Sequence, residues 1–155
     1  MTTIAWDGKT LAVDSLATCN EIISSYNEEK LFLNVGVYSA VAIAGNFAEM
    51  LELVEWLKTK DGEMPKANGT AMCVKPDGCC FSYHPKDGCS RPDREDNLAA
   101  SGTGWEIAIG ALEAGCDAVR AVEIAIKRDP FSGGKIQMFS LEEAPARLFS
   151  VEQNT

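Results

Sequence analysis

Histidine is almost absent from this sequence, which has His84 and no other. A Ser-His-Asp or Cys-His catalytic group would therefore have to include His84. That residue lies between two turn motifs, KPDG at 75–78 and PKDG at 85–88, so we expect it at a solvated hairpin tip. If the protein is a hydrolase, we expect another group to act as its base.

Positive charge is also scarce, with 14 Lys and Arg against 23 Asp and Glu and a net charge of -9. This balance argues against binding to nucleic acid, whose phosphate backbone needs a basic surface, and against binding to anionic membranes. No apolar run approaches the roughly 20 residues of a membrane span, and the N-terminus lacks the basic and apolar regions of a signal peptide. We therefore expect a cytoplasmic protein, and no cofactor is implied.

Six cysteines are present, and four of them cluster with the histidine in CVKPDGCCFSYHPKDGC. Structural zinc sites use paired Cys-x(2–4)-Cys knuckles. The spacing here is Cys-x(5)-Cys-Cys-x(3)-His-x(4)-Cys, over Cys73, Cys79, Cys80, His84 and Cys89. Free strand thiols are therefore favoured, and no metal site is expected. A zinc-binding module built on this cluster remains the weakest alternative.

Strand-like segments dominate the first third of the chain. Turns are expected at Asp7-Gly8 and at Asn34-Val35-Gly36, whereas residues 16–29 lack a regular pattern. The segment 37–45 is almost wholly apolar and should be a strand buried on both faces. The predicted strands are 3–6, 10–14, 30–35 and 37–45.

Helix capping residues and apolar periodicity organise the rest of the chain. Asn46 can cap a helix that runs to about Lys60, Asp117 can cap a helix at 118–128, and Gly115 ends a helix that begins at Trp105. The remaining segments are a predicted β-meander at 69–90, a charged loop at 91–97, a short strand entering a glycine turn at 98–104, and strands at 135–141 and 146–151. This order predicts a single α+β layered domain over residues 1–155.

The N-terminus offers a catalytic group that needs no histidine. Thr2 follows the initiator methionine, which is commonly removed before so small a residue and would leave Thr2 with a free α-amine. An α-amine has an ordinary pKa of about 7.7–8.0, so it can accept a proton from its own threonine hydroxyl near neutral pH. Lys30 could favour the alkoxide, Asp14 could pair with Lys30, and the Gly45 N–H could stabilise an oxyanion.

Five segments of the sequence carry a family resemblance. They are TTIAWDGKTLAVDS, EEKLFLN, AIAGNFAEM, ASGTGWEIAIGALEAG and RDPFSGGKI. In order and rough spacing they resemble the proteasome β-type subunits, the threonine-protease branch of the N-terminal-nucleophile (Ntn) hydrolases, which includes the bacterial HslV-type peptidases. The resemblance implies a four-layer αββα sandwich of two antiparallel sheets between helices.

The resemblance also implies roles for the residues near the N-terminus. Thr2 would be the nucleophile and its amine the general base. Asp14 and Lys30 would be the charged partners of Thr2. Gly45 would donate its backbone N–H to the oxyanion.

Further roles are implied later in the chain. Asp129 and Ser132 would orient the N-terminus through hydrogen bonds. Thr103 stands where the family has serine in a Gly-Ser-Gly turn, and its hydroxyl should make the same contact. Ile43 would form the floor of the pocket for the substrate residue before the scissile bond, and Phe47 its wall.

The implied function is that of a threonine-type endopeptidase that cleaves unfolded proteins or peptides. By the same resemblance it would assemble into a homo-oligomeric ring or related structure and receive substrates from a separate AAA+ ATPase. A self-cleaving Gly-Thr junction is absent, which matches the HslV-type arrangement in which only methionine is lost. The alternative is a non-catalytic scaffold subunit with the same fold.

Overall fold

The computed structural model describes residues 2–88, 90–141 and 149–151. Its elements in chain order are β1 (Thr3–Trp6), β2 (Thr10–Val13), β3 (Ala17–Cys19), β4 (Ile22–Ser25), β5 (Leu31–Val35), β6 (Tyr38–Gly45), α1 (Phe47–Thr59), β7 (Gly69–Val74), β8 (Cys80–Tyr83), a 3-10 turn η1 (Pro85–Asp87), β9 (Asp93–Glu95), β10 (Ala99–Gly102), α2 (Trp105–Glu113), α3 (Ala118–Arg128), β11 (Ile136–Ser140) and β12 (Phe149–Val151).

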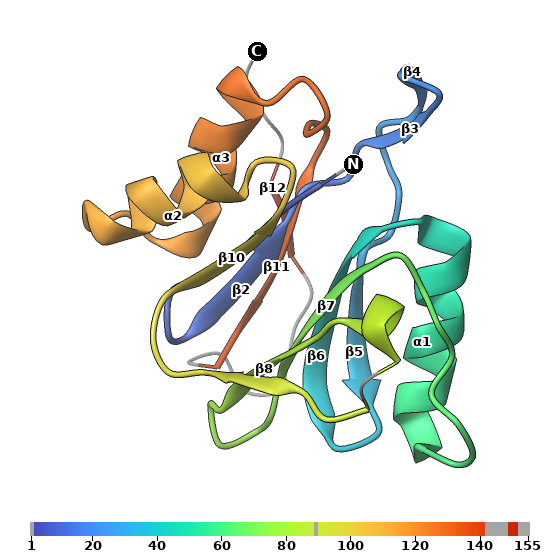
Figure 1. Ribbon diagram of the computed structural model, residues 1–155. Coiled ribbons are helices and arrows are strands. Elements are labelled where there is room, and N and C mark those ends of the chain that lie inside the picture. The colour runs from blue at the N-terminus through green and yellow to red at the C-terminus, as the bar shows by residue number, and fades with distance from the viewer. Residues whose placement is uncertain (1, 89, 142–148, 152–155) are drawn as a thin grey trace.

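Two five-stranded antiparallel sheets form the centre of the molecule (Figure 1). One has the strand order β10-β1-β2-β11-β12 and the other β5-β6-β7-β8-β9. Helices α2 and α3 lie on the outer side of the first sheet, and α1 lies on the outer side of the second (Figure 1). The α+β prediction and its four-layer αββα arrangement are therefore confirmed.

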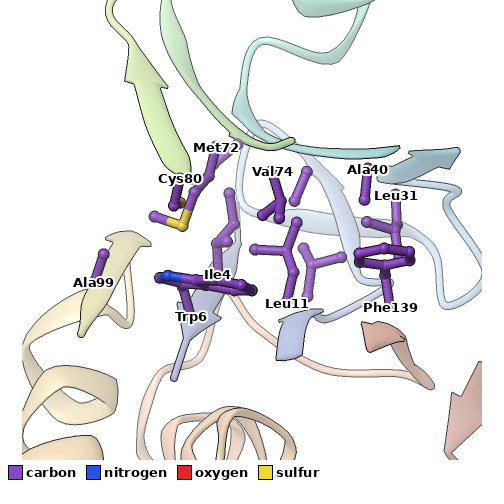
Figure 2. Close-up of a cluster of buried hydrophobic side chains, with 13 residues drawn as sticks. Ile4, Trp6, Leu11, Leu31, Ala40, Met72, Val74, Cys80, Ala99 and Phe139 are labelled. Carbon is purple, nitrogen blue, oxygen red and sulfur yellow. The ribbon is translucent and has the colours of Figure 1, made fainter. Parts of the chain in front are cut away.

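Alternation along the strands explains why the two sheets stack. Ile4, Trp6 and Leu11 of the first sheet face Met72 and Val74 of the second in an apolar core between the sheets (Figure 2). The residues that alternate with them are small, because they pack against helices: Ala5 and Ala12 meet α2 and α3.

Strand β6 is buried on both faces, as the sequence predicts. Ala40 and Ala42 belong to the core between the sheets, whereas Val41 and Ile43 pack under α1 with Met50. This alternation decides the direction of Ile43, whose side chain points to the helix side of the second sheet.

The capping predictions are confirmed at both helices. The Asn46 side chain accepts a hydrogen bond from the Glu49 N–H at 3.1 Å and begins α1. The Asp117 side chain accepts one from the Arg120 N–H at 2.8 Å and begins α3. Because α3 ends immediately before Asp129, its capping also sets where that carboxylate lies.

The β1–β2 hairpin forms as predicted. The Asp7 carboxylate accepts from the backbone N–H groups of Lys9 and Thr10 at 3.0 and 2.7 Å. Gly8 takes the left-handed region at φ +102°, which favours glycine. The hairpin aligns Ile4 with Val13, so Thr2 and Asp14 emerge at the same end of the sheet.

Three local predictions differ from the structure. Part of the segment 16–29 forms a separate hairpin of β3 and β4, which stands away from both sheets (Figure 1). The β5–β6 turn lies at Gly36-Val37, while Asn34 is a left-handed residue inside β5 at φ 55°. The expected loop 91–97 contains β9, whose charged residues suit an exposed sheet edge.

The zinc alternative receives no support from the placement of the cysteines. Cys73 is buried on the helix side of the second sheet, whereas Cys80 is buried between the sheets. Among the described residues no three His, Cys, Asp or Glu side chains form a group that could hold a metal, and Cys89 lies outside them. The His84 side chain is 49% exposed, which confirms its predicted solvated position.

No helix in the described part of the chain is long and apolar enough to cross a membrane.

Candidate active site

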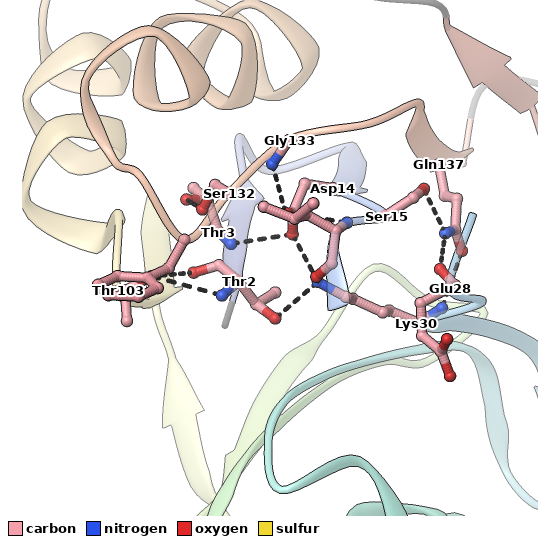
Figure 3. Close-up of polar contacts among 12 residues, drawn as sticks. Thr2, Thr3, Asp14, Ser15, Glu28, Lys30, Thr103, Ser132, Gly133 and Gln137 are labelled. Carbon is pink, nitrogen blue, oxygen red and sulfur yellow. Dashed lines mark hydrogen bonds and ion pairs between the residues drawn. The ribbon is translucent and has the colours of Figure 1, made fainter. Parts of the chain in front are cut away.

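Thr2 lies just before β1 and is buried, with 2% of its surface exposed. Its hydroxyl oxygen accepts a hydrogen bond from Lys30 Nζ at 2.9 Å (Figure 3). Lys30 directly precedes β5, so this contact joins the two sheets at one end of their common core. A buried ammonium beside a hydroxyl stabilises the alkoxide form, which is the form that acts as a nucleophile.

The Lys30 ammonium is held by acceptors on the segment that follows β2. It donates to Asp14 Oδ1 at 3.0 Å and to the Leu16 carbonyl at 2.6 Å. The Asp14 carboxylate also accepts from the backbone N–H groups of Thr3 at 3.1 Å and Gly133 at 2.9 Å (Figure 3). This carboxylate therefore connects the start of β1, the Lys30 ammonium and the loop after α3.

Burial has opposite effects on the two charged groups. It lowers the pKa of Lys30, and the negative charge of Asp14 opposes that change. It raises the pKa of Asp14, and the Lys30 ammonium and the Gly133 N–H oppose that rise. Each charge therefore depends on the other to remain ionised in the interior. The result is a cation that is weakly hydrated and directed at Thr2.

A second set of hydroxyls surrounds the backbone of Thr2. The Thr2 nitrogen lies 3.4 Å from Thr103 Oγ1, which donates to Asp129 Oδ2 at 2.6 Å. Ser132 Oγ donates to the same carboxylate oxygen at 2.6 Å and lies 2.7 Å from Thr3 Oγ1. Thr103 thus bridges the Thr2 nitrogen to Asp129. Ser132 is linked to this group through its hydrogen bonds with Asp129 and Thr3.

Gly45 ends β6 beside Thr2, and its backbone geometry requires glycine. Its φ is +116°, and a Cβ there would collide with the Asn68 carbonyl. The residue is exposed and borders two cavities that both contain Thr2. A backbone N–H at this position is available to a group that reacts with Thr2.

The first cavity has a volume of about 370 Å³ and extends from Thr2 and Lys30 to the beginning of α1. Ile43 and Phe47 line it, as their predicted roles require. Glu28 also lines it, so the cavity has an acidic side chain in addition to its apolar surface.

Gln137 is a buried residue of this site that sequence reasoning missed. Its Oε1 accepts from the backbone N–H groups of Lys30 and Leu31, each at 3.0 Å. Its Nε2 donates to Ser15 Oγ at 2.8 Å and to the Glu28 carbonyl at 2.7 Å (Figure 3). The side chain therefore fixes the start of β5, from which Lys30 extends. The available signal was a glutamine inside the otherwise strand-like run KIQMFSL.

Comparison with known proteins identifies similar chains. The chain is 28% identical to "Proteasome subunit beta 2" of Pyrococcus furiosus, over 82% of this chain and 78% of that protein. It is 26% identical to "Proteasome subunit beta 1" of Thermococcus kodakarensis, over 95% and 89%. It is 24% identical to "Proteasome subunit beta" of a Methanocaldococcus species, over 95% and 82%.

No family model matches the chain. The similarity to these subunits extends over most of the sequence and includes both sheets and all three helices in the described part. The matches point to β-type proteasome subunits and not to HslV in particular. In sequence, this chain is similar over most of its length to proteasome β-type subunits, and its two stacked sheets between helices agree with the fold that this resemblance implies.

Proposed function

We propose that this protein is an N-terminal threonine peptidase, a proteolytic subunit in which Thr2 is the nucleophile after removal of Met1. One observation carries the proposal: Lys30 Nζ lies 2.9 Å from Thr2 Oγ1 and is itself bound to buried Asp14 at 3.0 Å. Desolvating such an ion pair costs several kcal/mol, and apolar side chains of similar volume would hold the same segments together without that cost. Activation of the hydroxyl explains why the pair is there.

Removal of Met1 would convert the Thr2 nitrogen from an amide into an amine. That amine would take the hydroxyl proton as Thr2 Oγ1 attacks the substrate carbonyl carbon, and the Gly45 N–H would stabilise the oxyanion. The same proton would then pass to the leaving amine as the peptide C–N bond breaks. A water molecule would hydrolyse the resulting ester between substrate and Thr2, with the amine again acting as the base.

The hydroxyls around Asp129 would orient this base. Thr103 lies within 3.4 Å of the Thr2 nitrogen and donates to Asp129, which faces Ser132 as well. A carboxylate near the terminus would stabilise the ammonium that forms during attack. These residues would therefore act on the amine, whereas Lys30 and Asp14 would act on the hydroxyl.

An assembly with other subunits is part of the proposal. The relatives are named as proteasome subunits, and Ile22 and Ile23 on β4 and Tyr26 directly after it are 72%, 45% and 56% exposed. Large apolar side chains gathered on a projecting hairpin favour contact with another chain. We propose a homo-oligomeric ring or related closed assembly in the cytoplasm, in the HslV-like arrangement where only methionine is lost. A separate AAA+ ATPase would supply it with unfolded protein.

Mass spectrometry with a threonine-directed inhibitor tests the proposal. After incubation with a peptide epoxyketone, the intact mass should show loss of Met1 and one adduct, located on Thr2. Thr2→Ala should abolish both the adduct and peptide hydrolysis, whereas the surface variant Thr59→Ala should retain both. Full activity of Thr2→Ala would contradict the proposal. Retention of Met1 in protein from its own host, with no adduct, would establish the alternative of a non-catalytic scaffold subunit.

The first cavity suggests a preference for apolar residues before the scissile bond. Burial of a substrate Val, Leu or Phe side chain against Ile43 and Phe47 would contribute about 1.5–3 kcal/mol to binding. A fluorogenic peptide panel should therefore show fastest cleavage after medium-sized apolar residues. Preference for Arg that disappears in Glu28→Gln would show instead that the acidic side chain of this cavity decides specificity.

A further inference from the structure

Thr2 lies between two cavities, and the proposed peptidase function assigns a role only to the first, as the pocket for the residue before the scissile bond. The second cavity has a volume of about 300 Å³ and shares Thr2, Ala44, Gly45 and Asn46 with the first. It is otherwise lined by different residues, which include Thr103 and Trp105. A peptide whose scissile bond lies at Thr2 has two halves, and the two cavities meet where those halves would join.

The positions of Lys30 and Thr103 indicate which half each cavity would hold. Lys30 lines the first cavity and contacts the hydroxyl of Thr2. Thr103 lines the second cavity and lies 3.4 Å from the nitrogen of Thr2. In the proposed reaction that nitrogen gives its proton to the leaving amine, so the leaving amine must depart on its side. The second cavity is therefore on the leaving-group side.

Trp105 is the aromatic residue among those that line this cavity. It is the first residue of α2, directly after the turn that contains Thr103, and 47% of its surface is exposed. The described residues of this chain leave four other large apolar side chains exposed, at Ile22, Ile23, Tyr26 and Val37, and none of them lines the cavity. An exposed indole beside a reaction centre offers a large apolar face to a bound side chain.

We propose that the second cavity binds the leaving-group half of the substrate and that Trp105 selects an aromatic or large aliphatic side chain directly after the scissile bond. The inference rests on the proposed peptidase function and adds a specificity-determining residue to it. Asn68 lines the same cavity, and its backbone carbonyl lies beside Gly45, where it already accepts a hydrogen bond from the Asn46 N–H at 2.8 Å.

The first experiment compares internally quenched peptides that are identical except for the residue after the scissile bond, Phe or Gly. In the unmodified protein, kcat/KM should favour Phe by about tenfold or more, in line with the discrimination an apolar pocket provides. In Trp105→Ala that ratio should fall to about threefold or less, since the aromatic face is gone. Alanine is a good helix former, so α2 should still form.

A second measurement observes the leaving-group side alone. When the substrate acyl group is bound to Thr2 as an ester, an added amine can replace water. Its nitrogen bonds to the acyl carbon, the bond to Thr2 Oγ1 breaks, and the amine proton returns to that oxygen. Phenylalanine amide should therefore capture much more product than glycine amide in the unmodified protein, and Trp105→Ala should remove that advantage.

Two controls separate this inference from the proposed function. A peptide boronate adds to Thr2 without any leaving amine, so its affinity reports Thr2 and the first cavity alone. Val37→Ala truncates an exposed apolar residue at the opposite end of β6 and should leave both the Phe-to-Gly ratio and boronate affinity unchanged. Failure of the boronate to bind the unmodified protein would refute the peptidase proposal itself.

If the boronate binds, equal Phe-to-Gly ratios in the unmodified protein and in Trp105→Ala would overturn the inference. A change of oligomeric state in Trp105→Ala without a change of ratio would overturn it as well, because it would assign the exposed indole to contact between subunits.

Discussion

Replacing Lys30 with methionine should destabilise the protein strongly and in a pH-dependent way. Lys30 is 4% exposed and Asp14 is 0% exposed, so Lys30→Met leaves the Asp14 carboxylate buried without its cation. Loss of one partner from a buried ion pair costs about 3–5 kcal/mol. We expect a loss of that size in the free energy of unfolding near neutral pH, together with loss of peptidase activity.

The pH dependence follows from the direction of the Asp14 pKa. Burial already raises this pKa above 3.8, and removal of Lys30 removes an opposing charge and raises it further. A carboxyl whose folded pKa exceeds its unfolded value binds a proton more tightly in the folded state, so its penalty shrinks as pH falls through the folded pKa. The stability deficit of Lys30→Met should therefore be smaller near pH 5 than at neutral pH. It should shrink by about 1.4 kcal/mol for each pH unit by which the pH lies below the folded pKa of Asp14.

Urea unfolding at a fixed protomer concentration measures both effects, because concentration alters the stability of an oligomer. Lys58→Met is the matched control: Lys58 pairs with Glu55 at 2.7 Å, and the two side chains are 50% and 70% exposed. Its loss should cost less than about 1 kcal/mol at either pH. A deficit for Lys30→Met as small as that of the control, or one that does not shrink at lower pH, would refute our account of the buried pair.

Two further predictions concern the surroundings of Thr2, and a third concerns the cysteines of β7 and β8. Gly45→Ala should abolish covalent inhibition and destabilise the protein, because its Cβ would collide with the Asn68 carbonyl; an active, stable variant would refute this. Gln137→Leu should lower the free energy of unfolding by about 2–4 kcal/mol, because it removes the acceptor of the buried Lys30 and Leu31 N–H groups. Gln137→Glu retains that acceptor and should recover part of the loss. Metal analysis of the purified protein should find no stoichiometric zinc, because Cys73 and Cys80 face opposite sides of a sheet.

Short-range chemistry in the sequence predicted most of the elements. Asp7-Gly8 makes a tight turn, and Asn46 and Asp117 satisfy the free N–H groups at the starts of α1 and α3. Each of these interactions joins residues three positions apart, so the local sequence contains all the information needed. The β3–β4 hairpin was missed because its exposed strands lack the alternation that a buried face imposes.

The candidate site was predicted from the chemistry of a threonine behind the initiator methionine and from segments that resemble a known family. The chemistry named Thr2, Lys30 and Asp14, the resemblance added Thr103 and Asp129, and the structure brings these five together. Their catalytic roles stay predictions. The resemblance did not reveal Gln137, because a glutamine in a strand has no local signature of the four hydrogen bonds that it makes.

The sequence by itself therefore determined the hairpins, the capped helices and the layered α+β order, all of which depend on neighbouring residues. Tertiary structure alone decided what surrounds Thr2. Lys30 is 28 residues away from it along the chain and meets it because the two sheets stack with the same ends together. Thr103 is 101 residues away and meets it because β10 pairs with β1 within the first sheet. Burial of Ile4, Trp6 and Leu11 against the facing sheet drives the stacking of the two sheets. Because the hydrophobic effect is non-directional, the apolar pattern of a strand does not tell which distant segment the strand will pack against.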